Sequence, residues 1–297
     1  MRQIDRLIGS IRATGSPSAI GLDTRYEYIP EDFAARHSDG GRAGAIYEFN
    51  ARLLRGLRDI IPCVKIQAAY YEMLGPDGMS CMAKTIAEAR ALDYVVIVDA
   101  KRGDIGATAE AYSAAYLGTD APFRADFLTV NPYFGRDGVE PFISACERDG
   151  SGVFILVKTS NPSGRELQDL TLADGGPMYE RLAGMVSEWG APLMGSEGYS
   201  SVGAVVGATY PVQGADLRRM MPHTFFLLPG YGAQGARASD LAGCFDASGG
   251  GAVVAAARSL ICAHRKTAAA DFVRAARDEA LNMRDRLLEA IRHARPR

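Results

Sequence analysis

The chain has 297 residues, of which 47% are hydrophobic and 23% charged, a composition typical of a folded globular protein. Its formal net charge is −2 and its basic residues are dispersed, which argues against a nucleic-acid-binding surface. No apolar run has the roughly 18 residues that a membrane span needs, and Asp5 and Arg6 interrupt the N-terminal segment where a signal peptide would be apolar. We therefore expect a soluble, cytoplasmic protein that binds neither nucleic acid nor membranes.

Short apolar runs recur along the chain, separated by stretches with helical spacing. They predict strands at 19–23, 63–67, 94–99, 126–131, 153–158, 202–207, 224–229 and 251–256. Several are continuous runs of Val, Ile, Leu and Phe, as is typical of parallel strands buried on both faces. Eight strands alternating with helices predict one (β/α)8 barrel, a TIM barrel, over residues 1–297. A doubly wound sheet would alternate in the same way, so the count alone does not exclude it.

Two further segments have a recognisable character. The last stretch of the chain carries an apolar stripe at spacings of three and four, which predicts a long helix: Val273, Ala276, Ala280, Met283, Leu287 and Ile291. Residues 160–178 are rich in Gly, Ser and Asp, and we expect a long loop there. Loops of this length are often functional.

Cysteine and histidine give no sign of a metal site. The five cysteines are odd in number, widely scattered and without a CxxC pair, and the four histidines show no ligand spacing. We expect the cysteines to be small buried hydrophobic residues in an intracellular protein, and we expect no bound metal.

Polar residues gather where the predicted strands end. Asp23 ends the first strand, Lys65 lies inside the second, and Asp99 and Lys101 end the third. In a barrel these ends meet at one face, where active groups concentrate. A single polar residue at a strand end is more often a solvated cap. Lys65 is harder to explain in that way, because the run CVKIQ places its ammonium inside an apolar strand.

Asp99 and Lys101 lie two residues apart, so an extended strand projects both from the same face. If that face points into the barrel mouth, Lys65 can reach Asp99, and Asp104 follows in the turn at Gly103. The result is an alternating array of ammonium and carboxylate groups, in which each charge stabilises its neighbours. As a purely structural network it would be costly in a core, whereas a protonated lysine held by carboxylates suits a proton donor.

A second constellation lies late in the chain. The run PGYGAQG (229–235) follows the seventh strand and ARS (257–259) follows the eighth, which is the usual phosphate site of a barrel. Gln234 can donate amide hydrogens and Arg258 a bidentate guanidinium fork. The alternative is a glycine-rich turn beside a surface arginine. The position of both runs favours phosphate binding.

At this point the chain resembles a known family. DAKRGDIGAT (99–108) is similar to the DxKxxDI signature of the orotidine 5′-phosphate decarboxylases, the last enzymes of UMP (pyrimidine) biosynthesis. The resemblance extends over nearly the whole chain, through GLDTR (21–25), VKIQAAYYE (64–72), TVNPYFGRDGVEPF (129–142), VKTSNPSG (157–164), PGYGAQG and ARS. The runs TVNPYFG and KTSNPSG are similar to the longer bacterial branch of the family.

The resemblance implies a lyase: a homodimeric (β/α)8 barrel that decarboxylates orotidine 5′-phosphate to UMP and CO2 without cofactor or metal. Lys101 would donate the proton to pyrimidine C6, and Asp99 would lie beside the departing carboxylate. Lys65 and Asp23 would bind ribose hydroxyls, with Lys65 bridging to Asp99.

The remaining implied roles concern substrate binding. Asp104 and Thr108 would reach the ribose in the partner subunit's site, so the dimer would have shared active sites. Ser160 would read the pyrimidine edge, and Gln234 and Arg258 would hold the phosphate.

One position departs from the family. The shorter branch often has a tyrosine three residues after the phosphate arginine, where this chain has Ile261. A further phosphate contact would then come from elsewhere, and Tyr210 and Tyr231 are the candidates.

Two rival functions stay open at this point. One is a Mg²⁺-dependent decarboxylase or aldolase acting on a keto-sugar phosphate, which would use the Asp–Lys–Asp motif to hold the metal and an enediolate. The other is a barrel that only binds nucleotides as a sensor, for which the charged array would have no purpose.

Overall fold

The computed structural model describes residues 1–232, 235–267, 269 and 271–294. Parallel strands form one closed barrel in which each strand pairs with the next and β1 pairs with β8. The strands are β1 (Ser18–Leu22), β2 (Cys63–Gln67), β3 (Val95–Arg102), β4 (Phe127–Val130), β5 (Gly152–Lys158), β6 (Ser200–Val206), β7 (Thr224–Pro229) and β8 (Ala252–Ala256). The predicted (β/α)8 barrel is confirmed, and the β1–β8 pairing excludes a doubly wound sheet.

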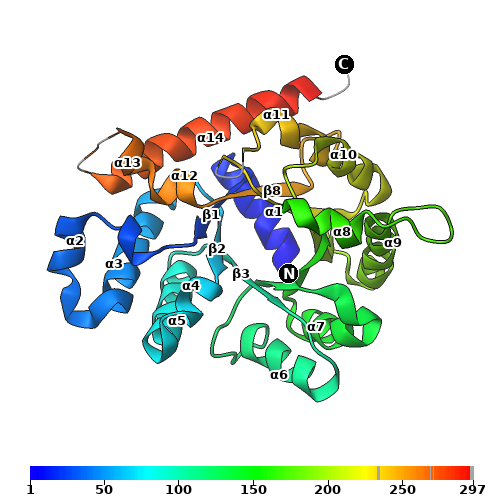
Figure 1. Ribbon diagram of the computed structural model, residues 1–297, viewed down its shortest axis with the longest axis horizontal. Coiled ribbons are helices and arrows are strands. Elements are labelled where there is room, and N and C mark those ends of the chain that lie inside the picture. The colour runs from blue at the N-terminus through cyan, green and yellow to red at the C-terminus, as the bar shows by residue number, and fades with distance from the viewer. Residues whose placement is uncertain (233–234, 268, 270, 295–297) are drawn as a thin grey trace.

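Helices surround the barrel as an outer layer, except α1, which lies across its centre (Figure 1). They are α1 (Gln3–Thr14), α2 (Glu31–Arg36), α3 (Gly41–Leu57), α4 (Ala69–Glu72), α5 (Gly75–Ala91), α6 (Gly106–Tyr116), α7 (Gly135–Asp149), α8 (Arg165–Gln168), α9 (Met178–Gly190), α10 (Pro211–Met220), α11 (Ala238–Leu241), α12 (Arg258–Ile261), α13 (Ala263–Thr267) and α14 (Phe272–Ala294). Short 3-10 turns lie at η1 (Tyr26–Tyr28), η2 (Ser38–Gly40), η3 (Pro132–Phe134), η4 (Pro162–Gly164), η5 (Ala191–Leu193) and η6 (Ala242–Cys244). Among the described residues, no helix combines the length and apolar character needed to cross a bilayer.

The barrel interior changes character along its axis. Near the amino ends of the strands it is filled by apolar side chains, including Cys63, Ile97, Phe127 and Phe154. Side chains two residues apart on a strand point to the same face, so the inward-facing positions continue toward the carboxyl ends of the strands. On β2, Lys65 follows Cys63 in this way. The fold therefore places an apolar floor directly beneath a polar mouth.

Helix α1 closes the floor of the barrel. Its Ile4 and Leu7 are fully buried and belong to the same apolar cluster as the inner faces of the strands. Arg6 fixes the helix from outside, since its Nη1 donates to Oδ2 of the buried Asp126 at 3.1 Å. In Figure 1 this helix passes across the middle of the ring. The opposite, carboxyl end of the barrel is left for the site.

The predicted long helix forms, whereas the predicted long loop contains short folded elements. Helix α14 forms, and its predicted stripe is buried except for Val273, which is half-buried. The segment 160–178, expected as a loop, contains η4, the one-turn helix α8 and an isolated bridge between Thr171 and Pro177. It is a short folded insertion, because tertiary contacts of α8 stabilise a helix too short to form alone.

The tight packing of the barrel interior can be tested at Gly203 on β6. A Cβ at this position would lie 2.6 Å from the ring of Phe154 and 2.7 Å from the backbone oxygen of Phe225. We expect Gly203→Ala to lower the free energy of unfolding by about 1–3 kcal/mol, measured by urea titration, because overpacking forces neighbours to shift. Gly184 of α9 is the matched control, since a Cβ there meets nothing within 4 Å. Equal stabilities of the two alanine variants would contradict the packing argument.

Candidate active site

A buried carboxylate organises the carboxyl end of the barrel. Asp99 is 6% exposed and accepts hydrogen bonds at both of its oxygens. Lys101 Nζ donates to Oδ1 at 2.6 Å, and Thr129 Oγ1 donates to the same oxygen at 3.0 Å. Lys65 Nζ and Gln67 Nε2 donate to Oδ2 at 3.0 and 3.1 Å. The carboxylate therefore exchanges water for four protein donors, two of them charged, which offsets the cost of its burial.

Lys65 links this carboxylate to a second one. Its Nζ lies 3.3 Å from Oδ1 of Asp23, just beyond β1, as well as 3.0 Å from Asp99. Pairing of β1, β2 and β3 in register brings the three side chains together. The sequence analysis expected the contact of Lys65 with Asp99, but it placed Asp104 and not Asp23 in the array. The described residues thus contain a continuous array Asp23–Lys65–Asp99–Lys101.

The two buried members of the array, Lys65 and Asp99, are held in their charged forms. Burial by itself would lower the pKa of Lys65, but the attraction of Asp23 and Asp99 outweighs it and raises that pKa above its ordinary value. Burial would likewise raise the pKa of Asp99, yet the ammonium groups of Lys65 and Lys101 hold it well below the usual range of a carboxyl. The mouth of the barrel is therefore a site of fixed, alternating charge.

Lys101 has an unusual backbone. Its φ is +49°, in the left-handed region that non-glycine residues seldom adopt. The register between β3 and β4 shifts here, since β3 advances from Val98 to Arg102 while β4 advances only from Leu128 to Val130. The backbone N–H of Lys101 donates to Thr129 Oγ1 at 2.8 Å, which stabilises the bend. Strain of this kind is common at functional positions, and here it aims the lysine side chain at the cavity.

Two members of the site were not identified from the sequence. Gln67 and Thr129 both contact Asp99, although each resembles an ordinary polar residue within a strand. A signal existed for Gln67, because it lies two residues after Lys65 and so shares its face. For Thr129 the signal was weaker, a single hydroxyl inside the buried run FLTV.

A cavity of about 660 Å³ opens above the array. Asp23, Lys65, Asp99 and Lys101 line one side of it, and the rest of the wall includes the predicted site residues Ser160 and Arg258. The volume is of the size that small-molecule sites usually have. Six residues from five different strand ends thus converge on one pocket, as expected for a barrel active site.

Of the two tyrosines considered for an additional phosphate contact, only Tyr231 lines this cavity. Tyr210 lies elsewhere, with its ring centroid 4.7 Å from Lys158 Nζ and its hydroxyl donating to the Asn161 carbonyl at 3.4 Å. Ile261 is buried in α12. Tyr231 is therefore the better-placed candidate, and the contact itself stays a prediction.

Two predicted residues that the structure describes, Asp104 and Thr108, are not part of the cavity wall. Asp104 lies in the turn after β3, where its Oδ1 accepts from the backbone of Ile105 at 2.8 Å, and Thr108 is exposed on the first turn of α6. Neither lines the pocket of its own chain. The predicted phosphate ligand Gln234 lies outside the described residues.

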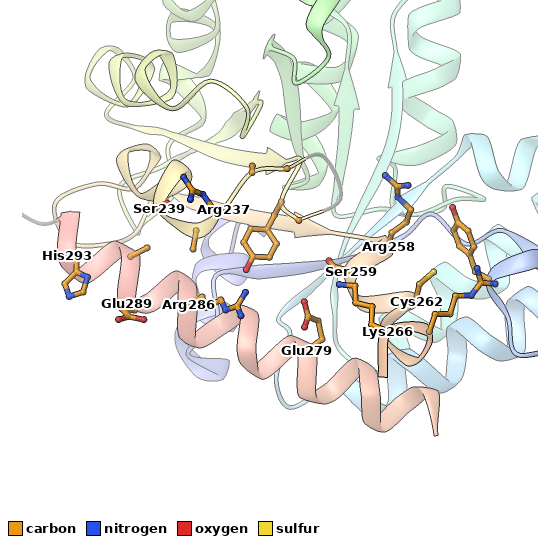
Figure 2. A pocket seen from close by; sticks show the side chains of 18 residues that line it. Arg237, Ser239, Arg258, Ser259, Cys262, Lys266, Glu279, Arg286, Glu289 and His293 are labelled. Carbon is orange, nitrogen blue, oxygen red and sulfur yellow. The ribbon is translucent and has the colours of Figure 1, made fainter. Parts of the chain in front are cut away.

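A larger cavity of about 950 Å³ lies behind the glycine-rich loop, between that loop and α14. Figure 2 shows Glu279, Arg286, Glu289 and His293 along the helix and Arg258, Ser259 and Lys266 at the other end. Of the residues that the structure describes, it shares only Tyr28, Tyr231 and Arg258 with the smaller cavity, and none of the charged array lines it. The smaller cavity, which contains the charged array, is therefore the candidate active site, although the other cavity has the larger volume.

The part of the chain that the structure describes contains no cluster of three or more His, Cys, Asp or Glu side chains arranged to hold a metal ion. Both carboxylates of the array are instead paired with Lys65.

Together, the closed barrel and the buried charges at its carboxyl end define the class of TIM-barrel enzymes whose site carries a preorganised acid–base array. The sequence profile of the Orotidine 5′-phosphate decarboxylase / HUMPS family matches residues 30–272, and the chain belongs to this family.

Individual relatives agree with the family match. An orotidine 5′-phosphate decarboxylase of Rhodopirellula baltica is 44% identical over 88% of each chain, and one of Clostridium tetani is 38% identical over 97% of this chain and 98% of the relative. The solved structure of the Leishmania donovani OMP decarboxylase superposes with a TM-score of 0.76 at 30% identity, covering 99% of this chain and all of the other. The family resemblance seen in the sequence is confirmed, and the relatives named orotidine 5′-phosphate decarboxylases are carboxy-lyases.

The depressed pKa of Asp99 gives a direct pH prediction. Because its folded value lies below the unfolded one, the array stabilises the fold above the ordinary aspartate pKa of about 3.9, and this contribution is lost as the pH falls through the folded value. We expect the Asp99 carboxyl carbon resonance, assigned with Asp99→Asn, to stay at its ionised position from about pH 9 to about pH 4. A titration centred at or above the ordinary value would show that the lysines do not hold the carboxylate ionised.

Proposed function

We propose that this chain converts orotidine 5′-phosphate to UMP and CO2, with Lys101 as the proton donor to pyrimidine C6. One observation carries the assignment of the donor. Lys101 Nζ lies 2.6 Å from the buried Asp99 and its side chain remains 45% exposed in the cavity. It is therefore fixed in position by a carboxylate and yet accessible to a ligand.

The reaction needs a positive charge at the place where negative charge develops. The bond between C6 and the carboxylate breaks, CO2 departs, and the electron pair remains on C6. The Lys101 ammonium stabilises that pair and then transfers a proton to it, and solvent returns the proton to the amine. Asp99 holds the ammonium in place, and Lys65 and Gln67 occupy the other oxygen of Asp99 so that the carboxylate does not rotate away.

The rest of the cavity suits the other parts of the nucleotide. Asp23 and Lys65 present polar atoms for the ribose hydroxyls, and Ser160 lies on the wall where the pyrimidine edge would be read. Arg258 begins α12 directly after β8, at the customary phosphate position of a barrel. The phosphate is remote from C6, so its binding energy can be used to lower the barrier of the chemical step.

A Mg²⁺-dependent keto-sugar-phosphate enzyme of the same scaffold is the rival. Two features argue against it. The curated relatives that match nearly the whole chain are orotidine 5′-phosphate decarboxylases. Lys65 also bridges Asp23 and Asp99, the carboxylates among the described residues that line the cavity, and a cation bound between them would displace it.

The activity and the donor can be tested together. Purified enzyme in EDTA should decarboxylate orotidine 5′-phosphate, followed by absorbance. Lys101→Ala should lose at least about a thousandfold in kcat yet still bind UMP, because it removes both the proton and the charge at C6. Lys84→Ala, at an exposed lysine of α5, is the matched control and should keep full activity.

Two results would count against this assignment. Activity that EDTA abolishes and Mg²⁺ restores would favour the keto-sugar rival, and near wild-type turnover by Lys101→Ala would remove it as the donor.

We further propose that the enzyme is a cytoplasmic homodimer with shared active sites. Ile105, Tyr133 and Phe134 are at least half exposed and lie around the turn that carries Asp104. Apolar side chains gathered at one place on a surface favour contact with another protein, and a second copy would bring the turn to its partner's cavity. Asp104 and Thr108 would then complete the partner's ribose site, which explains why neither lines its own. The free cysteines are consistent with a reducing compartment.

Subunit exchange tests the shared site. Lys101→Ala and Asp104→Ala should each be nearly inactive, but mixing them should restore activity. Each heterodimer would have one site with both residues intact and one with neither, so random pairing should recover about a quarter of the sites. If Asp104 served its own chain, every site would lack one residue and the mixture would stay inactive after exchange. That result would leave the decarboxylase assignment standing.

A further inference from the structure

Lys158 is a fully buried lysine that the proposed chemistry does not use. Its Nζ forms an ion pair with Asp169 and lies 5.1 and 4.7 Å from the ring centroids of Tyr179 and Tyr210. The side chain is 1% exposed, and Lys158 does not line the active-site cavity. An ammonium in this position costs several kcal/mol unless it is paired, so a purely apolar side chain would be the cheaper solution.

A local irregularity of the barrel explains where this lysine lies. Phe154 belongs to the inner apolar cluster and Leu156 lines the cavity, so alternation alone would direct Lys158 inward as well. The pairing of β5 with β6 shifts between Leu156 and Lys158, where β5 advances two residues and β6 advances one. The extra residue reverses the alternation, and the lysine faces α8 and α9 instead of the cavity.

The ion pair joins the end of β5 to the inserted segment. Asp169 is the C-cap residue directly after α8. The side chain of its neighbour Gln168, the last residue of α8, accepts from the Thr159 backbone N–H at 3.0 Å and donates to the Thr159 hydroxyl at 2.8 Å. Lys158 and Thr159 are therefore both fastened to α8. The next residue along the chain is Ser160.

The other side of Ser160 is fastened as well. Its carbonyl accepts from Thr209 Oγ1 at 3.0 Å, and the Lys158 carbonyl accepts from the Gly207 backbone at 2.7 Å. Thr209 and Gly207 belong to the loop after β6. Ser160 is thus held between that loop and α8, and the Lys158–Asp169 pair is the buried charged contact that anchors the α8 side.

We propose that Lys158 and Asp169 are positioning residues that fix Ser160 against the pyrimidine ring, and that they thereby set the affinity of the site for the base of the nucleotide. This inference rests on the proposed role of Ser160 in reading the base. The ion pair touches no part of the substrate and acts only through the backbone of residues 158–160.

A comparison of two ligands tests the proposal. Asp169→Asn keeps a side-chain oxygen that can accept from Lys158 Nζ, and it removes the negative charge that pairs with this buried ammonium. We expect its Kd for UMP, measured by calorimetry, to rise about tenfold, the scale of coupling between residues in contact. The Kd for ribose 5-phosphate, which has no base, should change by less than about twofold, the size of change expected when the substituted residue and the ligand do not interact.

Lys158→Met should act in the same direction, and if it does not fold, Asp169→Asn decides. Glu197→Gln, which breaks the Arg12–Glu197 pair, is the matched control and should leave both affinities unchanged. Unchanged UMP binding in Asp169→Asn, or equal losses for UMP and ribose 5-phosphate, would overturn the proposal.

A double-mutant cycle separates positioning from general weakening of the fold. In a Ser160→Ala background, Asp169→Asn should cause no further loss of UMP affinity, because the group that it positions is already absent. Additive losses would overturn the proposal. Both binding measurements are independent of turnover, so a wild-type chain that binds UMP but leaves orotidine 5′-phosphate unchanged would refute the decarboxylation and not the positioning.

Discussion

The active site depends on keeping one carboxylate ionised inside the barrel. Asp99 accepts from donors on β2, β3 and β4, so its hydrogen bonds are satisfied only when three strands pair in the right register. A slip of β2 or β4 would leave a buried charge without partners, which is among the more costly errors that a fold can make. The group that the chemistry needs therefore also penalises misregistered barrels. Stability and function are coupled here through a single side chain.

The division of the barrel into an apolar floor and a solvated mouth reduces the cost of burying these charges. Ile97 of β3 packs in the apolar floor, and Asp99 lies only one alternation further along the same strand. On β4, the hydroxyl of Thr129 follows Phe127 in the same way. Water reaches the mouth through the cavity, so Lys101 and Asp23 remain partly solvated while Lys65 and Asp99 are buried. The graded burial lets two ions be held rigidly and leaves the outer ammonium accessible.

Much of this could be predicted from the sequence, and the exceptions share a cause. Apolar runs and polar strand ends are local patterns, so the strands, Lys65, Asp99 and Lys101 could be identified from them. The positive φ of Lys101 and the outward direction of Lys158 both follow from register shifts between neighbouring strands, which no single segment encodes. Helix α8 lies in the segment whose composition predicts a loop, because its single turn depends on tertiary contacts made by Gln168 and Asp169. The role proposed for Asp104 involves a second chain and so has no counterpart in the geometry of one barrel.

The helix that seals the floor bears on the order in which the barrel is completed. Ile4 and Leu7 precede β8 by more than two hundred residues in the sequence, yet the cluster that buries them includes Val253 and Ala255 of β8. Their hydrophobic surface cannot be fully covered until nearly the whole chain has emerged from the ribosome. Contacts so distant in sequence close slowly, and the waiting surface is open to non-native association. Helix α1 thus precedes β8 in the chain but is fully buried only after β8 has formed, so its apolar face stays open to non-native association until the eighth strand is in place.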